Sequence, residues 1–354
     1  MSTIAGDGVA GAFLTNPMSV AVDSEDNIVF GDWSGFIRKI WNRDGALTIV
    51  AGTGILGYSG DGGQATSAML GRSTIALDTA GDIYIADGDN NRIRRVDVST
   101  GIITTIAGTG AAKDSGDGGA AINAGVSRPT GIAVDSTGDL YFSSSWSRVR
   151  KLSTDNGLIA TVAGQLITAF GGDGGPAIDA FFWDPVPSAV NQTGDIFIAD
   201  YENSRIRMIR QKTGIVTTVA GSGTCPAGPP PISASVCQGG FSGDGGPATS
   251  ASLNYASAVA LDAAGNLYIA DTINHRIRRV DSSTGFIYTI AGTGVSGFSG
   301  DGGPALEAEI TTPAAITVDP SGKVYFADEG NNRIRVLTPV AGQNSIEFRQ
   351  RPRR

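Results

Sequence analysis

The chain is poor in the residues that most metal-dependent and acid-base enzymes use. It contains one histidine and two cysteines among 354 residues. A single histidine argues against zinc sites built from several histidines, and it leaves no spare partner for a Ser-His-Asp triad. His275 is therefore the only histidine available as a catalytic base, and it is the candidate for that role.

Long apolar runs are also missing, and most of the positive charge is dispersed along the chain. No run reaches the roughly 18 residues of a membrane span, so we expect none. The net charge is −8, and the basic residues lie mostly in evenly spaced "RIR" peptides, which argues against nucleic-acid binding. Because 41% of residues are hydrophobic and only 17% are charged, the 51 glycines belong to a folded chain and not to a disordered linker.

A small set of peptides recurs in a constant order. The motif "SGDGG", or "GGDGG" in one copy, follows a peptide ending in Ala-Gly, such as "TTIAG" (104–108). Peptides like "IALD" (75–78), "IYIAD" (83–87) and "RIRRV" (92–96) come next. All are short, rich in β-branched residues and bounded by turn-forming residues, which indicates four strands per unit.

The residue that closes the second strand gives the period of the repeat. Six such units are present, and single sheets of this length cannot bury both faces alone. We predict an all-β fold, a six-bladed β-propeller of four-stranded blades, with residues 1–342 as one domain and 343–354 as a disordered or vector-derived tail. Successive gaps are 55, 57, 56, 71 and 57 residues between Asp32, Asp87, Ser144, Asp200, Asp271 and Asp328.

The ring must close between its first and last blades. The N-terminal peptide "STIAG" (2–6) matches an outer strand, and the last blade lacks one after "RIRVL" (333–337). A competing copy, "TPVAG" (338–342), carries a proline that cannot donate to a ladder. We therefore predict that the N-terminal strand pairs with the last blade.

The recurring pattern "AVD…G…LYIAD…N.RIR…TG…TIAG", with "NHR" at 274–276, resembles the NHL-repeat family of six-bladed propellers. The resemblance covers about residues 2–340. Members of that family are extracellular recognition modules, RNA-binding modules and a few enzymes, so the resemblance implies one of these roles. Related six-bladed propellers include calcium-dependent lactonases and phosphotriesterases. Since one fold hosts many activities, the resemblance predicts the fold more strongly than the function.

The "SGDGG" motif falls where the chain crosses from one blade to the next, on the face that also carries the turn between the second and third strands. We call this the upper face. Glycines there permit positive φ, and the following residues, as in "GGPATSASL" (245–253), predict a helical turn with Pro at its first position. The Asp is expected at the N-terminus of that turn. Calcium binding by these loops is an alternative, although each offers only one carboxylate.

A second motif, Asp-x-x-Asn-x-Arg, is complete in four blades. We expect its Asp to bond nearby amides and its Arg to pair with the Asp or to stack between blades. The functional alternative is a metal site. Its ligands would be Asp87, Asp200, Asp271 and Asp328. When the six repeats are aligned, the residues expected where the innermost strands open onto the channel mouth are not ionisable. This weighs against a carboxylate-rich metal centre there. These residues are Met18, Ser73, Thr130, Val186, Ser257 and Ala314.

Departures from the repeat point to a ligand site. Blade 3 has "SSSWSR" (143–148) in its turn, and the next crossing carries "AFFWDP" (180–185). Both lie on neighbouring sectors of the upper face, where aromatic and hydroxyl groups would line a small-molecule pocket. Packing of the aromatics between blades is the alternative. The predicted ligand-binding residues are Ser144, Ser145, Trp146, Phe181, Trp183 and Asp184.

The two cysteines, Cys225 and Cys237, lie in the one long insertion (221–240). A disulfide between them would indicate an exported, extracellular or periplasmic protein, while two free thiols are the alternative. We predict a monomeric ligand-binding or interaction propeller whose upper face takes a small molecule, glycan or protein. The alternative is a calcium-dependent hydrolase of lactone or phosphotriester type; calcium is expected only in that case.

Overall fold

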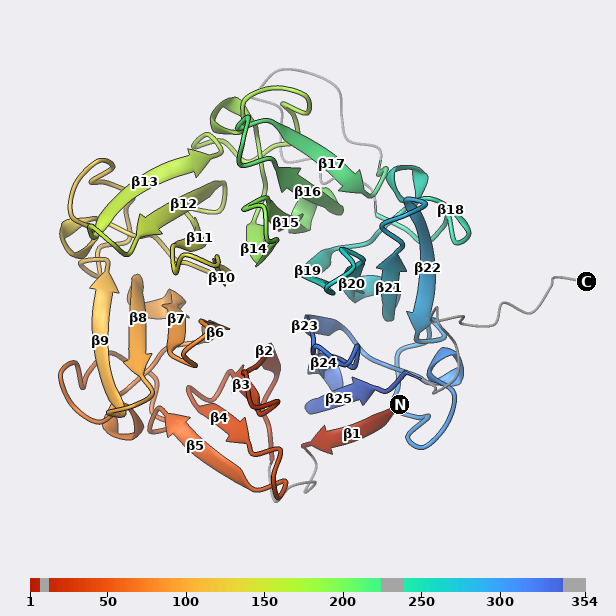
Figure 1. Ribbon diagram of the computed structural model, residues 1–354, viewed down its shortest axis with the longest axis horizontal. Helices are drawn as coiled ribbons and strands as arrows, with labels where there is room; N and C mark the ends of the chain where they lie inside the picture. Colours follow the sequence, from red (N-terminus) through yellow and green to blue (C-terminus); the bar gives the residue numbers. More distant parts are fainter. Residues whose placement is uncertain (7–12, 224–238, 340–354) are drawn as a thin grey trace, which may run out of the picture.

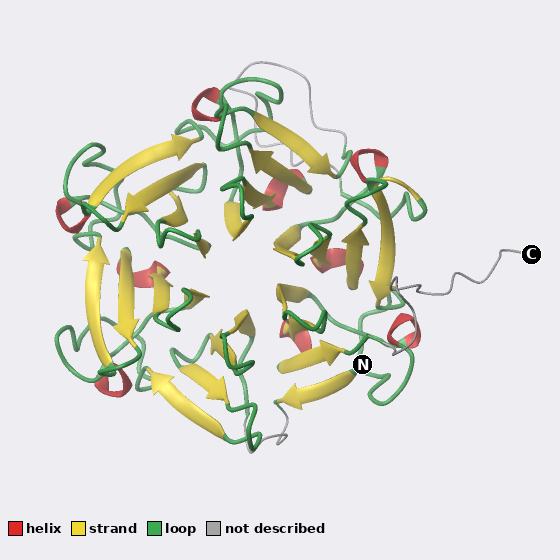
Figure 2. Cartoon of the chain, in the orientation of Figure 1, coloured by secondary structure: helices red, strands yellow, loops and turns green. Residues whose placement is uncertain are grey.

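The computed structural model describes residues 1–6, 13–223 and 239–339, and they form a ring of six sheets around a central axis (Figure 1). Each sheet has four antiparallel strands, and the fifth blade has an extra two-residue strand, β18 (Gly246–Pro247). Figure 2 shows that the helical segments are short turns between strands. The prediction of an all-β six-bladed propeller is confirmed. Cys225, Cys237 and the predicted tail lie outside the described residues.

Strands run from the axis outward in each blade. The innermost strands are β2 (Pro17–Val22), β6 (Ser73–Leu77), β10 (Ile132–Val134), β14 (Pro185–Val190), β19 (Ala256–Leu261) and β23 (Pro313–Val318). The second strands are β3 (Ile28–Asp32), β7 (Ile83–Asp87), β11 (Leu140–Ser144), β15 (Ile196–Asp200), β20 (Leu267–Asp271) and β24 (Val324–Asp328). The third strands are β4 (Ile37–Ile40), β8 (Arg92–Asp97), β12 (Arg148–Ser153), β16 (Arg205–Ile209), β21 (Arg276–Val280) and β25 (Arg333–Leu337). The outer strands are β5 (Leu47–Ala51), β9 (Ile102–Ala107), β13 (Leu158–Ala163), β17 (Val216–Ala220), β22 (Phe286–Ala291) and β1 (Ser2–Ala5).

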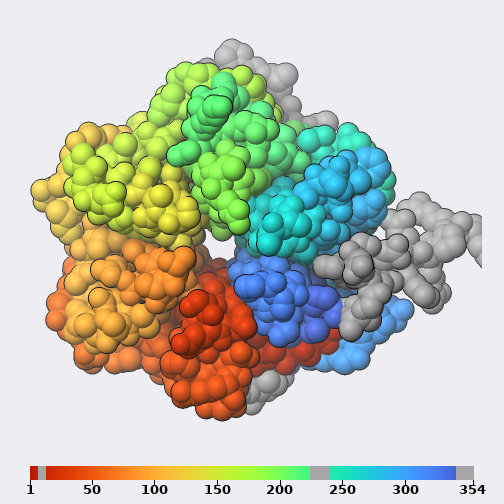
Figure 3. All heavy atoms as spheres, viewed as in Figure 1, coloured from red at the N-terminus to blue at the C-terminus, as the bar shows by residue number. Residues whose placement is uncertain are grey.

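The hydrophobic core lies between the blades. Every residue of the second strand β7 is buried, because both faces of its sheet pack against neighbouring blades. One buried cluster, for example, joins Val29 and Ile37 of blade 1 to Ile75 and Ile85 of blade 2. Each blade therefore needs two neighbours, which explains why the chain repeats the unit until the ring closes. Figure 3 shows the hollow that remains where the blades meet.

The N-terminal strand closes the ring as predicted. Strand β1 pairs antiparallel with β25, with Ser2 opposite Val336 and Thr3 opposite Arg335. Ala5 belongs to the buried cluster shared by blades 6 and 1. The last blade is thus completed by the first residues of the chain.

The "SGDGG" peptides fold over the outer edges of the blades. In blade 2, Gly62 donates to the carbonyl of Ile103 (2.8 Å), and Ile103 donates back to Gly63 (3.0 Å). In blade 6 the same bond runs from Gly302 to Met1 (2.8 Å). Exposed edge strands invite pairing with other chains, so this peptide protects the edge that it covers.

The turn that follows each motif differs from the prediction. It is a 3-10 helix of three residues, as at Ala248–Ser250, and Pro247 precedes its first position instead of occupying it. The Asp of the motif is also not at a helix N-terminus. Its carboxylate turns inward to a buried arginine, because an ion pair with a guanidinium is stronger than contact with a single exposed turn.

These arginines stand in the middle of the third strands. Five are nearly inaccessible, and each pairs with the Asp of the motif that covers its own blade; Arg207, for example, lies 2.9 Å from Asp173 and 3.2 Å from Asp200. It also donates to the carbonyls of Gly171 and Phe181. We call these five the arginine belt: Arg94, Arg150, Arg207, Arg278 and Arg335.

The first arginine of each "RIR" peptide has a different role. Arg92 stacks on Tyr58, 3.7 Å from the ring centroid, and Arg276 stacks in the same way on Phe241. The predicted stacking of this arginine is confirmed. The pairing with the second-strand Asp, which we expected of the same residue, is made by the second arginine instead, as Arg207 shows.

Candidate functional site

The turns between second and third strands ring the mouth of the central channel on the upper face. In blades 2, 4, 5 and 6 the turn is a 3-10 helix, as at Gly88–Asn90, followed by a left-handed residue such as Asn91. Blades 1 and 3 have irregular turns. These two display tryptophans, Trp33 and Trp146, that are 38% and 43% exposed.

The blade 3 turn holds Trp146 in an unfavourable backbone conformation. Ser145 and Trp146 both have positive φ (55° and 63°), which non-glycine residues seldom adopt. Adjacent segments of the same chain hold this conformation in place: the N–H of Ser145 donates to the carbonyl of Ser127, and the carbonyl of Trp146 accepts from the N–H of Asp184 (2.7 Å). Strain that the surroundings maintain is typical of functional positions.

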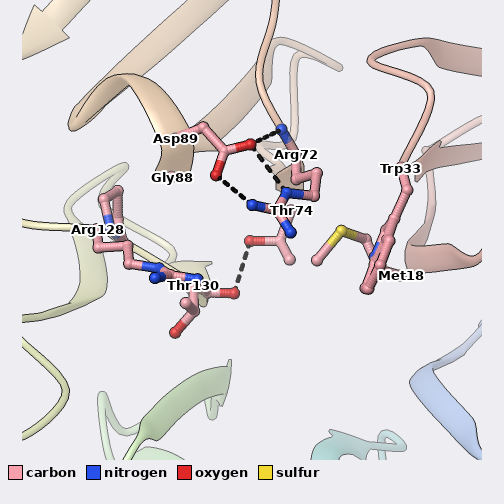
Figure 4. Close-up of a pocket in the computed structure, with 9 residues that line it drawn as sticks. Met18, Trp33, Arg72, Thr74, Gly88, Asp89, Arg128 and Thr130 are labelled. Carbon is pink, nitrogen blue, oxygen red and sulfur yellow. Dashed lines mark hydrogen bonds and ion pairs between the residues drawn. The ribbon is translucent and has the colours of Figure 1, made fainter. Parts of the chain in front are cut away.

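A pocket of about 140 Å³ lies over the mouth ends of blades 1 to 3, with blade 2 in the middle (Figure 4); Trp33 of the blade 1 turn lines it, and Trp146 of the blade 3 turn reaches it only through Arg128. Trp33 and Met18 line one side, and Arg128 lines the other. Thr74 donates a hydrogen bond to the carbonyl of Thr130 across the pocket (3.0 Å). Aromatic, apolar and hydroxyl groups therefore converge on one small concave surface, which is the usual composition of a ligand site.

The two arginines of the pocket differ in their partners. Arg72 binds both carboxylate oxygens of Asp89, at 2.9 Å each, and this contact lowers the pKa of Asp89. Arg128 stacks on Trp146, 4.5 Å from the ring centroid. Within the described residues its guanidinium has no hydrogen bond or ion pair.

Asp184 is a titratable group beside this side of the mouth. It lies within hydrogen-bond distance of the Thr130 hydroxyl, at 3.3 Å. Burial raises the pKa of Asp184 to about 6, and the nearby charge of Glu202 adds to the rise. Asp184 therefore changes its charge near neutral pH.

Blades 4 to 6 line the other half of the mouth with tyrosines and carboxylates. Tyr201 and Tyr255 meet edge to face, with ring centroids 5.1 Å apart. Burial raises the pKa of Tyr201 to about 12, and Glu202, Asp184 and Glu329 contribute to that rise. The two halves of the mouth thus have opposite character, cationic and indole-rich in blades 1 to 3 and acidic and phenolic in blades 4 to 6.

A ring of hydrogen bonds joins neighbouring blades at this level. The backbone N–H of Asn16 donates to Asn332, that of Arg128 to Asn91, and that of Tyr255 to Ser204. His275 occupies the same position, and its Nδ1 accepts from the N–H of Thr312 (3.1 Å). This geometry gives His275 an inter-blade structural contact; a catalytic role for it stays an untested prediction.

The predicted ligand-binding residues separate into two groups. Trp146, Ser145 and Asp184 meet beside the pocket through the contacts described above. Ser144 is fully buried and bonds Asp114, so it replaces the second-strand Asp of other blades. Phe181 and Trp183 are half-buried along the crossing, where the N–H of Trp183 donates to Asp200.

The four aspartates predicted as metal ligands under the hydrolase alternative are not brought together. Each lies in its own blade with its side chain fully buried beside an arginine of the belt, at 3.1 to 3.6 Å. In the part of the chain that the structure describes, no three His, Cys, Asp or Glu side chains are grouped to hold a metal ion. Asp87, Asp200, Asp271 and Asp328 therefore do not fit a calcium ion as a set.

Sequence reasoning did not find most of the pocket. Trp33, Arg72 and Arg128 were missed, although blade 1 also departs from the repeat, with "GDWSGF" (31–36), and that departure was a usable signal. The alignment placed Ser73 at the channel mouth, whereas Ser73 is buried and Thr74 lines the pocket.

The chain is thus a six-bladed propeller with a small pocket on its upper face, and comparisons with known proteins agree with this class. Human teneurin-4 is 33% identical over 302 residues, which are 78% of this chain and 10% of teneurin-4. SUPPRESSOR OF QUENCHING 1 of Arabidopsis thaliana, a chloroplastic protein, is 26% identical over 276 residues, 74% of this chain and 24% of that protein. The chain spans less than a quarter of the length of these relatives. No protein-family model matches it, so membership of the NHL-repeat family stays a prediction.

Solved structures show the same fold. A protein of unknown function from Bacteroides thetaiotaomicron aligns with a TM-score of 0.67 at 17% identity, covering 95% of this chain and 73% of that one. An auxiliary nutrient binding protein from the same organism aligns with a TM-score of 0.64 at 17% identity, covering 91% and 69%. These identities support the fold alone. No helix in the described ranges is long and apolar enough to cross a membrane.

Proposed function

We propose that this protein is a binding propeller that takes its ligand at the channel mouth of the upper face, in the pocket between Trp33 and Arg128. The main observation is that the only two irregular turns among the six each display an exposed tryptophan at this pocket: Trp33 lines it, and Trp146 stacks on the lining residue Arg128. Fold requirements explain the regular turns but do not explain these departures. An auxiliary nutrient binding protein shares this fold, so the fold is compatible with a binding role.

A ligand screen on paired variants tests this proposal. Small molecules and glycans are screened against the wild type by thermal shift and tryptophan fluorescence. Any compound that binds is then titrated into Trp33→Ala and Trp146→Gly. We expect binding to weaken by about fivefold or more in either variant, because an aromatic contact contributes on the order of 1 kcal/mol or more.

Trp41→Ala is the matched control. Trp41 lies at the turn between β4 and β5, on the opposite face, where its indole bonds Thr48. Binding that is unchanged in Trp33→Ala and Trp146→Gly, or that falls equally in Trp41→Ala, would contradict a ligand site at the mouth.

The hydrolase alternative has one observation in its favour. Asp184 titrates near pH 6 and contacts the pocket residue Thr130, and general acids and bases often have pKa values raised in this way. Among the described residues calcium dependence has no ligand set in support, because the four predicted aspartates each lie beside an arginine of the belt. Lactone and phosphotriester hydrolysis that is abolished by a chelator would establish this alternative.

Export and a monomeric state also stay proposals. Export rests on the cysteine pair at positions 225 and 237, which a thiol assay without reductant tests: two reactive thiols per chain would remove the argument. Sedimentation equilibrium tests the monomer.

A further inference from the structure

We infer that the pocket recognises a ligand carboxylate through Arg128, with the ring or short chain that bears it lying against Trp33 and Met18. This inference rests on the proposed binding function and names the chemical class of its ligand.

Arg128 is a fixed cation without an anionic partner. Its backbone N–H is held by Asn91 (2.9 Å), its φ is 47°, and the following Pro129 is buried. The indole of Trp146 supports one face of the guanidinium. The side chain is exposed, and its N–H donors have no acceptor among the described residues. Arg72 in blade 2 is the useful contrast, because Asp89 already neutralises it.

A stacked guanidinium leaves its edge of N–H donors free. That edge is planar and matches the two oxygens of a carboxylate in bidentate geometry. The opposite wall of the pocket is formed by Met18 and by Trp33, whose ring also lies 5.5 Å from the guanidinium of Arg72 (Figure 4). The two walls together suit a molecule that has an anionic end and a less polar body.

The surrounding charges favour a monoanion over a dianion. The charge of Arg128 favours the charged form of Asp89 and opposes the burial that raises the pKa of Asp184, so Arg128 lies within electrostatic reach of both carboxylates. Because Arg72 already neutralises Asp89, a phosphate dianion would meet one uncompensated cation and the nearby negative charge of Asp184, and the repulsion would offset the gain. A carboxylate carries half that charge. The volume of about 140 Å³ is that of roughly five water molecules, which limits the inserted part to a small group.

Calorimetric titrations with matched probes test the inference on the full chain at pH 7. Benzoate and glucuronate supply carboxylates, benzamide and glucose are their neutral counterparts, and benzylamine and inorganic phosphate supply the other charges. We expect benzoate or glucuronate to bind at least about tenfold more tightly than its neutral counterpart, because charge-assisted hydrogen bonds are the stronger kind.

Two variants locate the recognition. Arg128→Gln removes the charge and keeps a side chain of similar reach, and we expect it to weaken carboxylate binding by about tenfold or more. Arg43→Gln is the control, since Arg43 also stacks on an indole, Trp41, but on the opposite face. We expect less than about a twofold change there.

The outcomes separate this inference from the proposed function. Equal binding of benzoate and benzamide, or a preference for benzylamine or phosphate, would overturn the carboxylate assignment and leave a ligand-binding mouth intact. Carboxylate binding that persists in Arg128→Gln would overturn the role of Arg128. If no probe bound and the wider screen also found no ligand that depends on Trp33 or Trp146, both would fail.

Discussion

In the arginine belt the blades are alike and every guanidinium meets a carboxylate, whereas at the mouth neighbouring blades differ and Arg128 meets none. Arg207 shows the first pattern, with two aspartates and two carbonyls around one buried side chain. The comparison teaches that the charged residues of the belt, which recur from blade to blade, pair with carboxylates inside the protein. Arg128, which lies outside this repeated pattern, keeps its charge available to a ligand. Substitutions in the belt should therefore change stability, and substitutions at the mouth should change binding.

The largest expected effect is in the belt. Arg207→Ala leaves the buried carboxylate of Asp200 without its guanidinium, and breaking a buried pair in this way costs about 3 to 5 kcal/mol of unfolding free energy. Denaturant unfolding measures this loss. The exposed neighbour Arg210→Ala is the control and should change stability by less than about 0.5 kcal/mol. A similar small change in Arg207→Ala would mean that the belt does not support the fold.

Substitutions in the "SGDGG" motif should lower the free energy of unfolding by less than Arg207→Ala does. The size of the loss should depend on how closely neighbouring atoms approach the substituted glycine. Gly60 has a φ of 87°, and an added Cβ would lie 2.7 Å from the Cα of Ala68, so Gly60→Ala combines backbone strain with a clash. We expect a cost of about 2 to 4 kcal/mol. Gly62 has a φ of 82° with open space around it, so Gly62→Ala should cost only about 1 to 2 kcal/mol. Equal losses in thermal unfolding would show that the close packing on Ala68 is unimportant.

His275 should contribute about as much as one hydrogen bond. His275→Ala removes the acceptor for the N–H of Thr312, at a cost of about 1 kcal/mol. His275→Asn should lose less, because Asn91 and Asn332 make the same contact between other blades. If both variants lost equal stability, the hydrogen bond between His275 and Thr312 would not be what His275 contributes to stability.

The same contact predicts a pH dependence of stability. Burial and the charge of Arg276 lower the pKa of His275 in the folded protein. Its contribution is then fully present above the unfolded pKa of about 6.5 and is lost as the pH falls through the folded value. Unfolding measured from pH 8 to 5 should show this loss in the wild type relative to His275→Asn.

The smallest expected effect concerns Asp184 at the mouth. Its pKa of about 6 means that it is mostly charged at pH 7 and mostly neutral at pH 5. Arg128, Glu202 and Asp200 are the charged groups that act on it. Carboxylate binding should therefore strengthen by about threefold between pH 7 and 5, as the repulsion from Asp184 disappears. Asp184→Asn should abolish this dependence; a dependence that survives would point to another group.

The sequence predicted the scaffold well because its signals are local and repeated. Strand residues such as Ile83 to Asp87 alternate with turn residues at a period of 55 to 57 residues, with one longer gap of 71, and "STIAG" matches the missing strand directly. The partner of the motif Asp was not predictable in this way. Asp61 and Arg94 are 33 residues apart, and only the fold of the crossing over the outer strand brings them together.

The mouth was harder to predict for a different physical reason. Whether Ser73 or Thr74 faces the pocket depends on register, and β6 lacks the bulge that interrupts β2, β14, β19 and β23. Arg128 and Asp184 reach the mouth because they adopt positive φ, which the sequence does not reveal for non-glycine residues. Pattern reasoning therefore found Trp146 and Asp184 but not the pocket beside them.

A methyl NMR spectrum of methionine-labelled protein tests most directly whether the residues that stabilise the fold are separate from those that bind the ligand. Met18 lines the pocket, whereas Met208 is buried in β16, next to the belt residue Arg207. On titration with a ligand found in the screen, we predict that the Met18 methyl signal shifts progressively while the Met208 signal stays in place. A shift at Met208 without one at Met18 would contradict the account, because binding would then act on the scaffold and not at the mouth.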